Sequence, residues 1–185
     1  MRTKSLNLYL NQGVWYRFGA IMFFAALTAL TARITLHLPF TPVPVTLQTL
    51  AVVLSGLVLG ARLGALAQVT YLGLILMGTP LDANALGPDA LLGPTAGYLV
   101  AFVPAAGLTG WLIENVGKES WWGNFVAAVA GIFVIYGVGV SWLAVIIGSL
   151  PQALVAGILP FILFDLVKAA IAAGVAESGK QLLHR

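Results

Sequence analysis

An acid and a base stand three residues apart in a stretch of sequence that otherwise carries no charge. Asp165 and Lys168 lie within Pro160–Ile171, in a hydrophobic segment long enough to cross a bilayer. A charge at the centre of a membrane helix costs about 2.5–3.5 kcal/mol by insertion scales. At this spacing both side chains lie on one helix face, so they form either a structural ion pair or part of a site. In a site, Asp165 accepts N–H groups of an amide-like or urea-like ligand, and Lys168 holds a carboxylate.

The composition is typical of a polytopic membrane protein. Hydrophobic residues make up 60% of the chain and charged residues 8%, with a mean hydropathy of +0.99. Soluble domains carry about a quarter charged residues, so a soluble fold of this size would lack the charges to cover its surface. The net charge of +3 is spread singly along the chain and forms no basic stripe, which argues against nucleic acid.

The chemistry of several enzyme classes is missing from the sequence. There is no cysteine, and the two histidines, His37 and His184, are far apart, so no metal or thiol site and no cofactor is expected. The phosphate-binding pattern GxxxxGK[ST] is also absent, so any ATP dependence requires a separate protein. We expect a protein that is not an enzyme.

Hydrophobic segments predict an all-α fold of six transmembrane helices in a single membrane domain, residues 1–185. The second and third helices are separated by the tight turn Gly60-Ala-Arg62-Leu-Gly64, because the whole segment is too long for one crossing of about 20 residues. The predicted helices are 18–36, 47–61, 63–78, 93–115, 122–142 and 152–178.

The basic residues predict the orientation of these helices. One side of the membrane carries most of them, whereas the third loop, on the other side, carries Asp82 and Asp89 but no base. Positive charge marks the cytoplasmic side of a membrane. We therefore expect a prokaryotic plasma membrane protein with both termini on the cytoplasmic side. The residues on the predicted inner side are Arg2, Lys4, Arg17, Arg62, Lys118, Lys180 and Arg185.

The first connection on the predicted outer side is rich in proline. Three prolines between residues 39 and 44 exclude a helix and favour extended backbone over His37–Thr46. Thr46 and Gln48 follow at the start of a membrane helix, where they either cap the helix or point into an outward cavity.

The next outer connection, Thr79–Leu92, brings further polar groups to the same level. Asn84 and Tyr98 supply donors and acceptors there. Gly93 and Gly97 allow close approach of the backbone, which serves either a ligand or ordinary helix packing.

Polar residues from three separate segments are thus expected at one side of the membrane. Mainly apolar walls with a few convergent polar groups are typical of a small-molecule site. These residue types predict that the ligand is a small neutral or anionic solute, but they do not identify it. The converging pairs are Thr46/Gln48, Asn84/Tyr98 and Asp165/Lys168.

The first helix has small residues at a spacing of four. Ala25 and Ala29 form a small-xxx-small pair. Such a pair packs against the chain's own bundle or against another membrane subunit.

Three strings of this sequence resemble the BioY family, the biotin-binding S components of energy-coupling factor (ECF) transporters. The strings are TPVPVTLQTLAVVLSGLVLGARLGALAQ, LLGPTAGYLVAF and LPFILFDLVKAAIAA, and they occur in the family's order from helix one to the C-terminus. The third connection departs from the family's common glycine-rich run and reads LDANALGPDALLG.

The resemblance implies an S component that binds biotin, its transported ligand, from the outer side. It implies partners in addition to membrane lipid, namely a transmembrane T component and two ATPase subunits. Docking on the T component is expected through helix one, near Ala25 and Ala29.

The resemblance also implies roles for the polar residues. Asp165 and Asn84 hold the ureido ring of biotin, and Lys168 and Tyr98 lie toward its carboxylate or the pocket rim. The residues that shape the pocket floor are Gln48 and Thr46, and those that let the backbone approach the bicyclic ring are Gly93 and Gly97. Two alternatives remain: an S component for another vitamin or small carboxylated solute, and a membrane scaffold in which Asp165 and Lys168 only fix helix packing.

Overall fold

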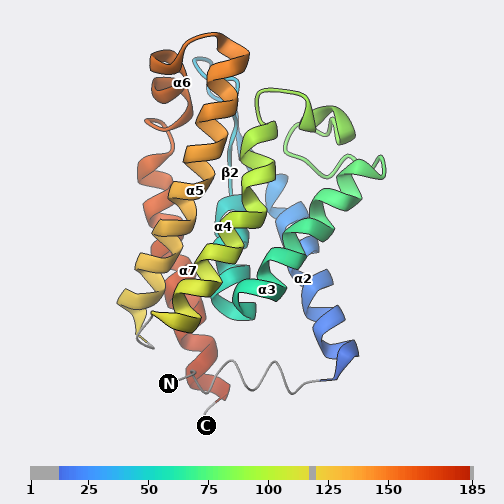
Figure 1. The fold of residues 1–185 in the computed structure, drawn as a ribbon, viewed down its shortest axis with the longest axis vertical. Helices are drawn as coiled ribbons and strands as arrows, with labels where there is room; N and C mark the ends of the chain where they lie inside the picture. The colour runs from blue at the N-terminus through green and yellow to red at the C-terminus, as the bar shows by residue number, and fades with distance from the viewer. Residues whose placement is uncertain (1–12, 117–119, 184–185) are drawn as a thin grey trace.

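The computed structural model describes residues 13–116 and 120–183, and these form a helical bundle (Figure 1). Some basic residues behind the predicted orientation lie outside this described part: Arg2, Lys4, Lys118, Arg185 and the side chain of Lys180. The main helices are α2 (Val14–Ala32), α3 (Gln48–Leu76), α4 (Ala96–Asn115), α5 (Trp121–Ile147), α6 (Leu150–Gly157) and α7 (Ile162–Leu183). The shorter elements are β1 (Thr35–Leu36), β2 (Val45–Thr46) and the 3-10 helix η1 (Gly87–Leu91).

Helix α3 consists of two halves that reverse direction at Gly60. This glycine has φ 81° and ψ −179°. The conformation lies outside the helical region, and its positive φ favours glycine. A side chain on Gly64 would meet the backbone of Gly56 and Ser55 at about 3.0 Å, so the two halves lie side by side. The side chain of Glu114 on α4 accepts a hydrogen bond from Ala61 N (2.7 Å) and caps the second half.

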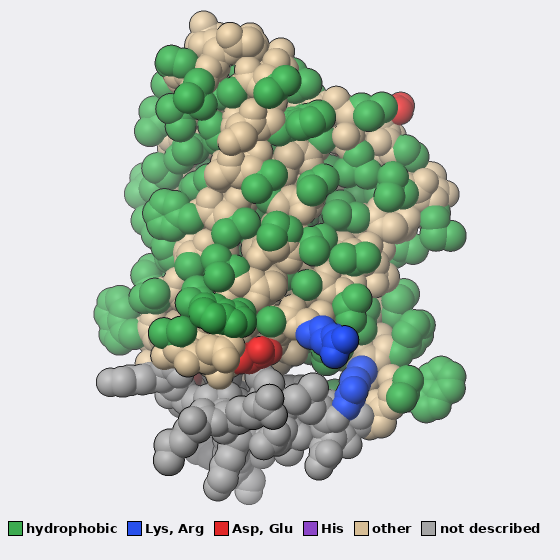
Figure 2. Space-filling model, viewed as in Figure 1, with side chains coloured by type: hydrophobic (Ala, Val, Ile, Leu, Met, Phe, Trp, Pro, Cys, Tyr) green, Lys and Arg blue, Asp and Glu red, His purple; other side chains and the backbone are tan. Residues whose placement is uncertain are grey.

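The described residues make six apolar crossings, as the hydrophobic segments predict. Helices α2, α3, α4 and α5 are each long and apolar enough to span a membrane, and the bent pair α6–α7 passes the same test as one broken span. Because α3 reverses at Gly60, its halves count separately. The exposed face in Figure 2 is correspondingly covered by hydrophobic side chains, with Lys and Arg side chains near its lower end.

Several helix ends differ from the predicted ones. The first helix ends at Ala32 and not at residue 36, because Thr35 and Leu36 pair with Thr46 and Val45 in an antiparallel ladder. The last predicted helix, 152–178, is broken between α6 and α7, with a bend of 49°. Hydrophobicity continues across both places, so it does not reveal where the backbone leaves the helix.

Three segments between the long helices gather at one end of the bundle, opposite the end where α2 begins and α7 finishes (Figure 1). We call this the loop end, and it comprises 33–47, 77–95 and 148–161. Hydrogen bonds join these segments: Arg33 donates to Pro80 O, and Thr41 Oγ1 donates to Ala156 O (2.8 Å).

A buried polar network ties α2 to both halves of α3. Thr28 Oγ1 donates to Gln68 Oε1 (3.3 Å), and Gln68 Nε2 donates to Ser55 Oγ (3.1 Å). All three side chains are completely buried, so each needs a partner within the protein. The network therefore fixes the position of α2 along α3.

The crossing of α3 and α4 depends on glycine at position 110. A Cβ atom on Gly110 would overlap the backbone of Gly60 and Ala61, whereas one on Gly107 would lie 3.8 Å from Ala65 Cβ, an ordinary contact.

We therefore expect Gly110→Ala to lower the free energy of unfolding by about 1–3 kcal/mol, because the two backbones must move apart. Gly107→Ala on the same helix is the control and should leave stability unchanged or slightly raised. Unfolding in detergent micelles measures both. Equal effects of the two substitutions would contradict this account of the crossing.

Candidate functional site: a polar pocket at the loop end

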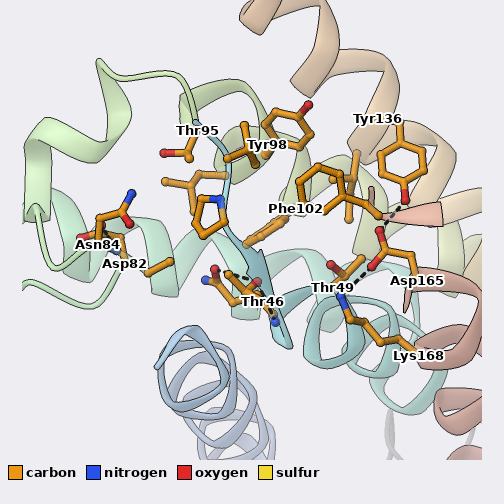
Figure 3. Close-up of a pocket in the computed structure, with 17 residues that line it drawn as sticks. Thr46, Thr49, Asp82, Asn84, Thr95, Tyr98, Phe102, Tyr136, Asp165 and Lys168 are labelled. Atoms are coloured by element: carbon orange, nitrogen blue, oxygen red, sulfur yellow. Dashed lines mark hydrogen bonds and ion pairs between the residues drawn. The ribbon is translucent and has the colours of Figure 1, made fainter. Parts of the chain in front are cut away.

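A pocket of about 580 Å³, counting its open mouth, lies beneath the segments of the loop end. Its lining comes from the β2–α3 segment, the α3–α4 connection, α4, α5, α7 and the turn before α7 (Figure 3). Most of the walls are apolar, including Leu99, Phe102, Ile135 and Phe161. Apolar walls with a few polar side chains are typical of small-molecule sites.

One end of the pocket holds a buried, charged group. Lys168 Nζ lies 2.7 Å from Asp165 Oδ1, and Tyr136 OH donates to Asp165 Oδ2 at 2.5 Å. The two charged residues are only 4% and 5% exposed. Asp165 lies in the first turn of α7, where the helix dipole stabilises a carboxylate. We call Asp165, Lys168 and Tyr136 the acid–base group.

The acid–base group can both accept and donate hydrogen bonds toward the pocket. Each carboxylate oxygen of Asp165 has more than one acceptor position, and the ammonium of Lys168 has three N–H donors. Asp165 lies between Tyr136 and Lys168, with its carboxylate at the pocket (Figure 3). The acid and the base balance each other, so this end suits a neutral polar ligand group.

The opposite end of the pocket is formed by the α3–α4 connection. The two carboxylate oxygens of Asp82 accept hydrogen bonds from Asn84 N (3.0 Å) and Gly87 N (2.8 Å), which orders the loop. His37 Nε2 donates to Asn84 Oδ1 (2.9 Å), so the Asn84 amide group keeps its N–H donors for other partners. Figure 3 shows Asn84 and Asp82 across the pocket from Asp165 and Lys168.

Thr46 and Gln48 also line the pocket, between its two ends. Gln48 Nε2 donates to Tyr71 OH (2.7 Å), and Thr46 Oγ1 donates to Gln48 Oε1 (3.3 Å). Thr46 Oγ1 further accepts from Gln48 N (3.2 Å) at the start of α3. These side chains therefore both line the pocket and hold the N-terminus of α3 in place.

Tyr98 lines the pocket, but the glycines near it do not. Tyr98 OH donates to Gly157 O (3.1 Å) and joins α4 to α6. A side chain on Gly97 would overlap Trp142 of α5, and Gly93 O accepts from Trp142 Nε1 (2.9 Å). Gly93 and Gly97 thus contact α5. This position matches the helix-packing alternative for the two glycines and not a role at the ligand.

Ala25 and Ala29 are buried inside the bundle, with exposures of 0% and 7%. The chain's own helices cover both residues, so neither is presented to a partner subunit in this conformation. Their position matches the alternative in which Ala25 and Ala29 pack within the chain's own bundle.

Tyr136 is a site residue that reasoning from the sequence missed. The sequence does contain a sign of this role. Tyr136 places a phenol in the middle of an apolar membrane segment, where its hydroxyl needs a hydrogen-bond partner. Among the residues that the structure describes, no cluster of three or more metal-ligating side chains accompanies it.

The acid–base group predicts that removing the base alone is costly. Lys168→Met leaves the Asp165 carboxylate buried without a counter-charge, and we expect a loss of about 3–5 kcal/mol in stability. The double substitution Asp165→Asn with Lys168→Met removes both charges and should recover most of this loss. Unfolding in detergent measures both variants. If the two were equally unstable, charge balance would not be the reason.

Comparison with known proteins places this geometry in context. The BioY family model matches residues 7–185. The biotin transporter BioY of Thermotoga maritima is 41% identical, with 86% of this chain and 92% of that protein covered. The probable biotin transporter BioY of Pyrococcus horikoshii is 40% identical, with 85% and 91% covered.

The fold is also similar to a solved structure. The S-component for biotin from an ECF-type ABC transporter superposes with a TM-score of 0.83 at 24% identity, with 90% of this chain and 91% of that chain covered. Because the family model matches nearly the whole chain, and relatives above 30% identity extend over most of it, this chain belongs to the BioY family.

Proposed function

We propose that this chain is the substrate-binding S component for biotin uptake by an ECF transporter. The observation that carries the proposal is the acid–base group, buried at one end of an otherwise apolar pocket. Relatives named biotin transporters, which align over most of their own length, support the choice of ligand.

The chemistry of biotin matches the two polar ends of the pocket. Its ureido group is neutral and presents one C=O acceptor and two N–H donors. Asp165 can accept an N–H, and Lys168 can donate to the C=O, so both needs are met by the acid–base group. The apolar side chains between the two ends then contact the ring and the alkyl arm.

We propose one orientation of the ligand in this pocket. Lys168 and Asp165 are 2.7 Å apart, so both act on the same end of an extended molecule. The ureido ring therefore lies at the acid–base group, and the alkyl arm runs toward Asn84, whose N–H donors face the carboxylate. This orientation differs from the roles that the resemblance implies. Here Lys168 contacts the ureido ring and not the carboxylate of biotin, and Asn84 contacts the carboxylate and not the ring.

The partners and the orientation in the membrane belong to the same proposal. The chain has no phosphate-binding loop, so transport energy comes from two ATPase subunits through a T component. Both termini lie in the cytoplasm of a prokaryote, and the loop end faces outward. Helix α2 is the docking helix, since 28% of its most apolar 18-residue window is buried within the chain, compared with 39% for α5 and 61% for α3 and α4. Its exposed residues, such as Gly19 and Phe23, replace Ala25 and Ala29 as the contact surface.

Asp165→Asn tests the ring assignment. We expect biotin affinity to fall by about 10- to 100-fold, the range for a hydrogen bond to a charged group. Calorimetry on the chain alone, without ATP, measures it.

The matched control is Asp89→Asn, which changes an exposed carboxylate of the same loop end and should leave affinity unchanged. The double substitution of Asp165 and Lys168, which keeps the charge balance, should also lose affinity. Full biotin affinity in both Asp165 variants would exclude the ring assignment.

Asn84→Ala tests the other end of the ligand. We expect biotin affinity to fall about 3- to 10-fold, because one partly solvated hydrogen bond is lost. Affinity for the methyl ester of biotin, which lacks the charged carboxylate, should change much less. Leu86→Ala, an exposed substitution in the same loop, is the control. Equal losses for biotin and its ester would show that Asn84 acts on the loop and not on the carboxylate.

A further inference from the structure

A second hollow lies behind the pocket, between α5 on one side and α6 and α7 on the other. It has a volume of about 1060 Å³, counting its open side, and its lining is almost entirely apolar. Tyr136 and Asp165 line both this groove and the pocket, so they form the wall between the two. We call this hollow the lateral groove.

The shape of the lateral groove follows from the local sequence. Val129, Phe133, Gly137 and Ser141 recur at intervals of four and present one face of α5 to the groove. Gly137 leaves open space there, because a Cβ atom on it would meet nothing within 4 Å. On the other side, the groove is bounded by α6 and α7, which meet at a bend of 49°.

The lateral groove is continuous with the surface that faces the membrane. Its rim carries exposed apolar side chains, including Phe133, Leu154 and Leu166, on helices that span the bilayer. Its floor is formed by Ile132, Tyr136 and Val140, which are buried. A molecule that contacts the floor must therefore enter between α5 and the pair α6–α7.

We propose that one acyl chain of a bilayer phospholipid occupies the lateral groove. Water gains little there, because a stable buried water needs two to four polar partners and the walls supply few. An unfilled groove forfeits dispersion contacts along its whole lining. A flexible acyl chain is already present at this surface and fills an irregular apolar space.

A transmembrane helix fits the lateral groove less well than an acyl chain. Close helix contacts in membranes use small residues, whereas the groove rim bears the large side chains of Phe133, Leu150 and Leu154. The acyl chain therefore packs against the back of the Tyr136–Asp165 wall.

Photocrosslinking tests the proposal in the intact chain. The protein is placed in nanodiscs of phosphatidylglycerol and phosphatidylcholine that carry a diazirine on an acyl chain, and adducts are mapped by mass spectrometry. We expect adducts on the floor residues Ile132 and Val140. Gly137→Leu places a side chain in the groove beside its floor and should reduce these adducts several-fold, while adducts on the exposed Val100 of α4 stay unchanged.

Gly73→Leu is the matched control. It makes the same change in α3, at a position where a Cβ atom would also meet nothing within 4 Å, and it should leave the floor adducts at the wild-type level. Both substitutions replace glycine within a helix by a better helix former, so the fold is retained.

The proposal is overturned if the floor residues carry no adducts, or if Gly137→Leu leaves them unchanged. Missing floor adducts together with loss of T-component co-purification in Gly137→Leu would assign the groove to a partner helix instead. Biotin binding is measured on the same samples. Binding without floor adducts rejects only the lipid site, and floor adducts without binding reject only the proposed function.

Discussion

The ion pair between Asp165 and Lys168 is the constraint on which the loop end of this protein depends. Two charges that are almost fully buried in a membrane helix are stable only with each other and with further hydrogen bonds. Tyr136 supplies one of these from α5, and the first turn of α7 supplies a favourable dipole. The pocket is thus arranged around a group that the chain must keep neutral overall.

The remaining architecture holds this group at a fixed place while leaving one side open to a ligand. Glycines bring α3 against α4 and α4 against α5 at backbone distance, so the helices around the pocket have little freedom to shift. Polar side chains at the loop end bond mainly to one another and to backbone carbonyls, as Tyr98 does to Gly157. These bonds hold the segments of the loop end together above the pocket.

The sequence was sufficient to predict the membrane class, the six crossings and the gathering of Thr46, Asn84 and Asp165 around one pocket, because charges and prolines in apolar sequence have few permissible places. It was not sufficient to locate the faces of the helices. In a membrane protein, lipid and protein interior are both apolar, so hydrophobicity does not separate Ala25, which is buried, from Ala26, which is exposed. For the same reason the break before α7 and the role of Tyr136 required the structure.

The reversal at Gly60 has a consequence for how the chain enters the membrane during synthesis. Each half of α3 is shorter than the roughly 20 residues that a lone insertion signal requires, so the two halves must be inserted together as one hairpin. At that moment the N–H of Ala61 has no partner, because Glu114 belongs to a later helix. This cap on the second half of α3 can therefore form only after α4 has been synthesised.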